Sequence, residues 1–230
     1  MTRGARYEAL LLDFYGTLVE EDTEFIARIV QRVAETSPRA PGAAEVGARW
    51  SRSFSARCAA AHGSHFRTQR ELELASLAEL LAHYESPLDA RELSDELFAY
   101  WVAPRAIAGA AEFLRELRVP VCVVSNIDAA DLEAAVAKQG WSFAAVVTSE
   151  GCRAYKPRAE LFETALARLG CAAGAVLHIG DSLASDVRGA SGLGIPVAWV
   201  NARGRPLPAD LGARPRYVVS RVSELASVIR

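Results

Sequence analysis

Hydrophobic and polar positions alternate along the chain between two patterns. Short runs that are nearly continuous in Val, Leu, Ile and Ala occur at residues 9–14, 121–125, 144–148, 176–179 and 196–200. Strands have this pattern when both faces of their sheet are covered. A last run at residues 216–219 predicts an edge strand, followed by a helix at residues 222–229.

Between these runs, apolar residues recur with helical spacing at residues 110–118, 129–139, 158–169 and 183–193. A regular alternation of strands and helices is typical of a parallel sheet that has helices on both faces. We therefore predict an α/β fold whose core is a Rossmann-like, doubly wound parallel sheet.

The alternation is interrupted once, at residues 21–101, where the pattern is entirely helical. Four segments there carry apolar residues at the spacing of a helix, namely residues 22–35, 43–61, 68–84 and 89–101. Ligands bind at the carboxyl edge of open α/β sheets, so a helical block inserted after the first strand is expected to cover that edge. We predict a core of residues 1–19 and 105–230 and an inserted all-helical cap domain of residues 20–104.

Composition and charge narrow the classes of function. Of the 230 residues, 51% are hydrophobic and 23% are charged, and the formal net charge is −2. This balance is typical of a globular protein and provides no field that attracts nucleic acid or an anionic membrane. No apolar run approaches the roughly 18 residues needed to span a bilayer. We expect a cytoplasmic protein that acts on a small molecule and keeps its four cysteines reduced. The sequence gives no oligomeric state.

Polar residues gather where the predicted strands end. Parallel strands end at one edge of a sheet, so these residues are expected to form one site. They are Asp13, Ser125, Asn126, Lys156, Asp181 and Asp186, with Thr17 close to the first. Two further carboxylates, Asp128 and Asp131, are expected to cap the helix that follows Ser125 and Asn126.

In order and spacing, these residues resemble the haloacid dehalogenase superfamily of hydrolases. The resemblance rests on Asp13-Phe14-Tyr15-Gly16-Thr17, then Ser125-Asn126, then Lys156-Pro157, then Gly180-Asp181 with Asp186. It covers nearly the whole chain, and the helical block matches the family's cap. It implies a hydrolase that works through a covalent intermediate, which splits one difficult displacement into two easier steps.

The resemblance also implies a role for each motif. Asp13 would be the nucleophile, Thr17 would orient it, and Gly16 would permit the sharp turn beside the substrate. Ser125 and Asn126 would bind the transferring group, together with Lys156, which would neutralise charge on Asp13.

The resemblance further implies a magnesium site. Asp181 would hold Mg²⁺ together with Asp13 and the carbonyl of Tyr15. Asp186 would support the waters of the metal or Lys156, and we include it among the candidate ligands.

Tyr15 departs from the pattern of the family's phosphatases, which usually carry an Asp at this position as the general acid. A Tyr stands here in the 2-haloacid dehalogenases. A halide leaves as a stable anion and needs no proton, whereas an alkoxide does. A phenol with a pKa near ~10 is a poor acid at pH 7. Tyr15 therefore favours dehalogenation, or phosphate esters with good leaving groups.

The fourth motif favours phosphoryl transfer. The dehalogenases resemble one another in carrying Ser and Asn where this chain has Asp181 and Leu183, and Tyr where it has Phe162. Their halide-binding Arg has no clear counterpart here. Three carboxylates and one lysine leave excess negative charge, which favours a divalent cation.

We therefore expect a Mg²⁺-dependent phosphatase of a small phosphorylated metabolite. A metal-independent 2-haloacid dehalogenase is the alternative, and a catalytically weak binding or regulatory module is a third hypothesis. In the cap, Trp50, Phe54 and Arg57 have helical spacing, which favours packing for the two aromatic residues and a solvated position for Arg57.

Overall fold

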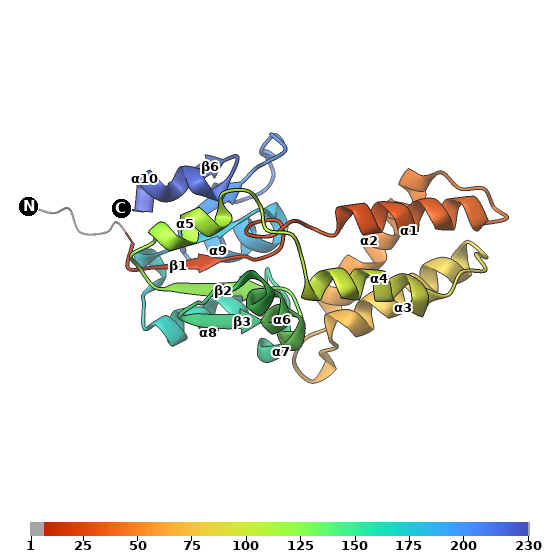
Figure 1. The fold of residues 1–230 in the computed structure, drawn as a ribbon, viewed down its shortest axis with the longest axis horizontal. Helices are drawn as coiled ribbons and strands as arrows, with labels where there is room; N and C mark the ends of the chain where they lie inside the picture. Colours follow the sequence, from red (N-terminus) through yellow and green to blue (C-terminus); the bar gives the residue numbers. More distant parts are fainter. Residues whose placement is uncertain (1–6, 230) are drawn as a thin grey trace, which may run out of the picture.

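The computed structural model describes residues 7–229, and these contain a six-stranded sheet whose neighbouring strands are all parallel (Figure 1). Its strands run in the order β3-β2-β1-β4-β5-β6. They are β1 (Ala9–Leu12), β2 (Val121–Ser125), β3 (Ala145–Thr148), β4 (Val176–Gly180), β5 (Val197–Val200) and β6 (Tyr217–Val219). The order reverses at β1, which is where open α/β sheets bind ligands. The predicted α/β fold is confirmed.

The sheet is buried on both faces, as the continuous apolar runs predict. In β1, Leu10 and Leu12 belong to one apolar cluster, whereas Ala9 and Leu11 belong to the other. All four side chains are fully buried. Successive side chains of a strand point to opposite faces, so a strand that is covered on both sides needs apolar residues at every position.

Helices cover the two faces. The face of Leu10 packs against α5 (Ala110–Glu116), α6 (Ala129–Gln139) and the C-terminal turns η4 (Val222–Leu225) and α10 (Ala226–Ile229). The opposite face packs against α8 (Ala159–Leu169), η3 (Leu183–Arg188) and α9 (Gly189–Gly192). Two short elements that the sequence pattern did not predict are α7 (Ser149–Cys152) and η2 (Ala173–Ala175).

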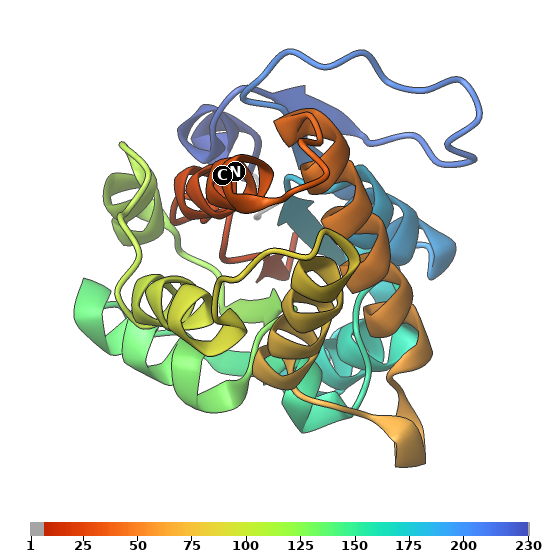
Figure 2. The same ribbon diagram turned by 90° about the vertical axis from the view of Figure 1, so that its right-hand side faces the viewer.

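Residues 21–101 contain no strand, as predicted, and every one of them is described. Their helices are α1 (Thr23–Thr36), α2 (Ala43–Ala60), α3 (Gln69–His83) and α4 (Ala90–Val102), with a single turn η1 (Gly63–His65). Figure 1 shows this segment beyond one end of the sheet, and Figure 2 looks onto its four helices with the sheet behind them. The division into a core and a cap with the boundaries given above remains our proposal.

Side chains that satisfy free backbone N–H groups mark where two of these helices begin. Thr68 accepts a hydrogen bond from the N–H of Glu71, whose carboxylate accepts one from the N–H of Thr68. At α4, the Asp89 carboxylate accepts bonds from the N–H groups of Arg91 and Glu92. Each such cap typically stabilises a helix by about 1 kcal/mol.

Two chain crossings connect the helical segment to the sheet. Val19 and Ala106 form an antiparallel bridge, and the N–H of Glu20 donates to the carbonyl of Arg105 at 2.8 Å. The two connecting segments therefore run side by side and form a neck between the sheet and the helical segment.

A second connection joins the start of α3 to the segment around Asp128 and Asp131, and it corrects a prediction. The Asp128 carboxylate accepts hydrogen bonds from the N–H groups of Gln69 and Arg70, so it caps α3 of the helical segment and not its own helix. Asp131 is buried and forms a two-pronged ion pair with Arg70, at 2.8 and 2.6 Å. Sequence position places these carboxylates next to α6, but the chain that packs against them comes from α3.

None of the helices within residues 7–229 is long and apolar enough to cross a membrane. The four cysteines of the chain all carry free thiols.

Candidate active site

The strand ends that the sequence singles out meet at one cavity. Its volume is about 200 Å³, and it lies between the carboxyl ends of β1, β2 and β4 and the helical segment. Its lining from the sheet side is Asp13, Tyr15, Ser125, Asn126, Ile127, Lys156, Asp181, Ser182 and Ser185. Its lining from the helical segment is Glu21, Asp22, Gln69 and Trp101. The sequence analysis missed these last four residues, because no motif marks them.

Asp13 follows β1 directly, and its position depends on the turn after it. The N–H of Asp13 donates to the carbonyl of Ile179 in β4 at 2.9 Å, which extends the strand pairing to Asp13. Gly16 then has a φ of +80°, which favours glycine. A Cβ atom at Gly16 would also lie 2.7 Å from the Asp181 carboxyl carbon. The predicted turn is present, and it needs glycine for a second reason as well.

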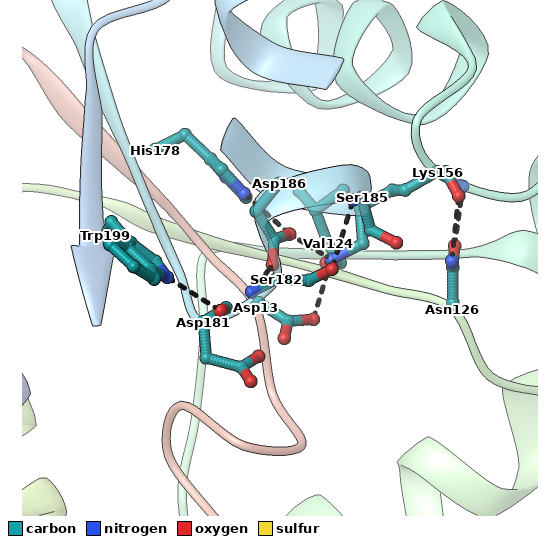
Figure 3. Close-up of polar contacts among 10 residues, drawn as sticks. All are labelled: Asp13, Val124, Asn126, Lys156, His178, Asp181, Ser182, Ser185, Asp186 and Trp199. Carbon is teal, nitrogen blue, oxygen red and sulfur yellow. Dashed lines mark hydrogen bonds and ion pairs between the residues drawn. The ribbon is translucent and has the colours of Figure 1, made fainter. Parts of the chain in front are cut away.

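Lys156 joins the acidic residues of the site (Figure 3). Its ammonium group donates to Asp13 Oδ1 at 2.7 Å, to Asp186 Oδ1 at 2.7 Å and to the carbonyl of Val124 at 2.8 Å. All three protons of the ammonium group are therefore used. The side chain is only 5% exposed, and although burial alone would lower its pKa, the two carboxylates raise the pKa above its usual value. Lys156 stays charged and neutralises part of the charge of Asp13.

Asp186 is a support for Lys156. Its Oδ1 faces Lys156 and, at 3.0 Å, Nε2 of His178, while its Oδ2 accepts the N–H of Ser182 at 3.0 Å. Burial opposes ionisation, yet Lys156 and His178 hold the pKa of Asp186 well below its usual range. Both oxygens are thus occupied, which fits the predicted support of Lys156 better than direct metal ligation.

The helix predicted at residues 183–193 is present, but its first residues are not a regular α-helix. Residues Leu183–Arg188 form a π-helical stretch before α9, a local widening that is frequent at functional sites. This stretch brings Asp186 against β4, where a Cβ atom at Gly180 would lie 2.3 Å from its carboxyl carbon. His178 in β4 is fully buried and is the second partner of Asp186.

Asn126 has a different contact from the one expected. Its amide donates to the carbonyl of Lys156 at 3.1 Å and accepts from the N–H of Lys156 at 2.7 Å. The side chain therefore holds the backbone that carries Lys156, a role the sequence did not indicate. Asn126 also lines the cavity, and its binding of the transferring group stays a prediction. Ser125 is buried and lines the cavity, so its hydroxyl fits the predicted binding role.

Asp13 and Asp181 carry the excess negative charge. Burial raises the pKa of Asp13 to about 7, although Lys156 opposes this, and it raises the pKa of Asp181 to about 8, helped by Asp13 and Asp186. The Asp181 carboxylate accepts no hydrogen bond from the described residues. A buried carboxylate pair of this kind is stabilised in its ionised form when a cation lies between its members.

The donor set fits Mg²⁺. One oxygen each of Asp13, Asp181 and Asp186 lies within 4.8 Å of the others. Carboxylate oxygens are the ligands that Mg²⁺ takes in proteins, usually one or two of them with waters and substrate phosphates. Asp13 and Asp181 are the suitable pair, because Asp186 is occupied. The carbonyl of Tyr15 as a further ligand remains a prediction.

Tyr15 and Thr17 complete the first motif. The Tyr15 hydroxyl lines the cavity but donates its proton to the carbonyl of Trp101, and burial raises the phenol pKa above its usual value. The Thr17 hydroxyl is fully buried and has no hydrogen-bond partner among residues 7–229. No hydrogen bond therefore carries the expected orientation of Asp13 by Thr17, which remains a prediction.

The chain matches the family of haloacid dehalogenase-like hydrolases across residues 7–194. The chain belongs to this family. The match includes the strand ends that carry Asp13, Ser125, Lys156 and Asp181, so the resemblance inferred from the four motifs is confirmed.

Relatives of both functional types are found. An (S)-2-haloacid dehalogenase of Pseudomonas fluorescens is 29% identical over 52% of this chain and 54% of its own. The N-acylneuraminate-9-phosphatase of Mus musculus is 28% identical over 62% of this chain and 61% of its own. The chain thus spans little more than half the length of the curated relatives it matches.

Solved structures extend the similarity to the whole fold. A dehalogenase solved as an intermediate complex superposes with a TM-score of 0.78 over 99% of both chains, at 22% identity. Such a match shows the haloacid dehalogenase-like fold.

Proposed function

We propose that this hydrolase is a Mg²⁺-dependent phosphatase that acts on a small phosphorylated metabolite through an aspartyl-phosphate intermediate on Asp13. The proposal rests on the pairing of Asp13 with Asp181. Without a cation, the pKa of Asp13 is about 7, so a large part of the nucleophile is protonated near neutral pH. A divalent cation held by the two carboxylates would keep Asp13 ionised and would attract a phosphate dianion, which the acidic cavity otherwise repels.

The residues of the chain divide the reaction between them. A carboxylate oxygen of Asp13 attacks phosphorus, the bond to the leaving oxygen breaks, and the leaving group departs as an anion. Lys156, held in place by Asp186 and Asn126, compensates the charge of Asp13. The Ser125 hydroxyl donates to a phosphoryl oxygen. Water then attacks the phosphorus of the intermediate, which releases phosphate and restores Asp13. Mg²⁺ held by Asp13 and Asp181 would supply positive charge that stabilises the transferring phosphoryl group.

The state of the Tyr15 hydroxyl indicates which leaving groups should react best. Its proton is donated to the carbonyl of Trp101, and its raised pKa makes it a weak acid. Leaving groups that depart without a proton should therefore react best. We expect aryl and acyl phosphates to be hydrolysed at least a hundred times faster than simple alkyl phosphates, because general acid catalysis is typically worth ~10²–10⁴ in rate.

Dehalogenation of 2-haloacids is the second candidate, and the comparisons favour it. Several matched relatives are named (S)-2-haloacid dehalogenases. Tyr15 occupies the position at which phosphatases carry the general acid, and dehalogenation needs no general acid there. The charge of the cavity opposes it. Among the described residues, Lys156 is the basic residue of the lining, and its three protons are already used. A haloacid carboxylate would face Asp13, Glu21, Asp22 and Asp181 without a counter-charge.

Two assays separate the candidates. The phosphatase hypothesis predicts phosphate release from p-nitrophenyl phosphate that is lost in excess EDTA and restored by Mg²⁺. The dehalogenase hypothesis predicts chloride release from 2-chloropropionate that EDTA does not affect. Asp13→Asn should reduce either activity below about a thousandth, because an amide cannot act as the nucleophile. Chloride release without phosphate release would refute our proposal, and the absence of both would favour a binding or regulatory module.

A further inference from the structure

A second cavity lies within the helical segment and adjoins the active site. Its volume is about 240 Å³. Three residues, Asp22, Gln69 and Trp101, line both this cavity and the active-site cavity. The other lining residues are Ile26, Gly47, Trp50, Ser51, Phe54 and Glu73. We call this space the cap cavity. The two cavities therefore share part of their walls.

Glu73 is the unusual residue of the cap cavity. It is on α3, is only 6% exposed, and its carboxylate makes no hydrogen bond or ion pair with the residues described. Glu and Asp are almost never buried unless they have a partner, because removing an unpaired charge from water is costly. Burial raises the pKa of Glu73 to about 8, and Asp22 contributes in the same direction. The side chain is buried as if a partner were missing.

The other residues that line the cap cavity indicate which charge a ligand of Glu73 would carry. Asp22 is the second carboxylate, and it accepts a hydrogen bond from the indole nitrogen of Trp101 at 2.8 Å. The described lining contains no Lys, Arg or His. Trp50, Phe54 and Trp101 supply three aromatic rings, and the Trp50 nitrogen is fixed by Ser76 at 3.0 Å. Two carboxylates and aromatic faces in a small space are the surroundings that bind a cation.

We propose that the cap cavity binds a protonated amine of the substrate, with Glu73 as the residue that determines this specificity. The substrate is then a phosphate ester that carries an ammonium group. The phosphate half of this statement rests on the proposed function, whereas the ammonium half rests on Glu73 and the cap cavity. Sequence reasoning assigned Trp50 and Phe54 to packing, and in this proposal both also contact the ligand.

A binding experiment tests the ammonium half without turnover. n-Butylammonium and n-butanol have similar size and differ in charge, and Trp50 and Trp101 in the cavity wall provide a fluorescence signal. We expect saturable quenching by n-butylammonium that is at least ten times weaker in Glu73→Gln, and no matching effect of n-butanol. Glu79→Gln is the control, because Glu79 is an exposed carboxylate on the same helix that does not line the cap cavity. It should bind like the wild type.

A turnover experiment tests the substrate class. The phosphate monoester of tyramine and 4-propylphenyl phosphate have the same shape, with an ammonium group replacing a methyl group. We expect a KM at least tenfold lower for the tyramine ester in the wild-type protein and in Glu79→Gln, and nearly equal values in Glu73→Gln. Since Glu73→Gln is isosteric, circular dichroism should show an unchanged fold.

The outcomes separate the two proposals. Butylammonium binding that depends on Glu73, without hydrolysis of any phosphate ester, would overturn the phosphatase proposal and leave the ammonium site standing. Equal effects of butylammonium and butanol, or binding unchanged in Glu73→Gln, would overturn the ammonium site.

Discussion

Lys156 and Glu73 show how differently two buried ionisable groups are treated in one molecule. Lys156 has three acceptors, two of them carboxylates, so its charge is compensated within the protein. Glu73 is buried to a similar degree and has no partner among the described residues. An acidic group that the fold leaves without a partner at a cavity is a candidate for ligand recognition, because a cationic ligand can pair with its ionised form.

The raised pKa of Glu73 predicts how stability depends on pH. Burial raises this pKa from its ordinary 4.5 to about 8, so the folded state binds a proton more tightly than the unfolded state does. The contribution of Glu73 to the free energy of unfolding is therefore fully present below pH ~4.5 and is lost as the pH rises toward 8. Between pH 5 and pH 9, Glu73 should lower the free energy of unfolding of the wild type by up to about 4 kcal/mol. We expect this decrease to be absent in Glu73→Gln.

Urea unfolding of the wild type and Glu73→Gln, in EDTA at pH 5 and at pH 9, measures this difference. Glu79→Gln is again the control and should keep the wild-type pH dependence. Parallel pH profiles for the wild type and Glu73→Gln would show that Glu73 has an ordinary pKa.

Among the elements, the turn that follows β1 decides the geometry of the proposed metal ligands Asp13 and Asp181. Gly16 has a positive φ and lies against the Asp181 carboxylate, so the turn and the carboxyl end of β4 are in direct contact. A side chain at this position would have to displace Asp181.

We therefore expect Gly16→Ala to reduce Mg²⁺-dependent turnover by at least a hundredfold. The added Cβ atom would lie 2.7 Å from the Asp181 carboxyl carbon, and the backbone strain adds roughly 1–3 kcal/mol of destabilisation. Gly170→Ala separates strain from contact, because Gly170 has a φ of +66° but no heavy atom lies within 4 Å of an added Cβ. That variant should lose stability and keep its activity. Equal activity loss in both variants would mean that strain alone explains the effect.

In the whole molecule, two connections position the helical segment over the site: the neck at Val19 and Ala106, and the contacts of Asp128 and Asp131 with the start of α3. Gln69 lines both cavities from that same turn of α3. The ion pair between Arg70 and Asp131 thus fixes the element that carries Gln69 and, one turn later, Glu73.

A double-mutant cycle of Arg70→Gln and Asp131→Asn measures this connection. Asp131 is buried, so Arg70→Gln alone leaves an unpaired buried carboxylate, and we expect a coupling free energy of about 1–3 kcal/mol. The exposed pair of Arg115 and Glu112 is the matched control, with an expected coupling of about 0.5 kcal/mol or less. A coupling at Arg70 as small as at Arg115 would contradict a structural role for the pair.

The sequence by itself determined the fold class and several neighbours of Asp13. Each strand carries its own signal, because a strand that is buried on both faces must be apolar at successive positions. The residues at the carboxyl ends of β1, β2 and β4 reach the same edge wherever the helices lie, so Asp13, Ser125 and Asp181 were predictable as neighbours.

Only the tertiary structure decided which partners these and other polar side chains have. Asn126 binds the backbone of Lys156, Asp128 caps α3, His178 contacts Asp186, and Glu73 faces a cavity without a partner. The partners lie between 8 and 59 residues away along the chain wherever a hydrogen bond joins them. The hydrophobic pattern of a segment depends on which of its own faces are buried. The hydrogen-bonded pairs depend on how separate segments pack against one another. For this reason the site was predictable in outline, and the cap cavity was not.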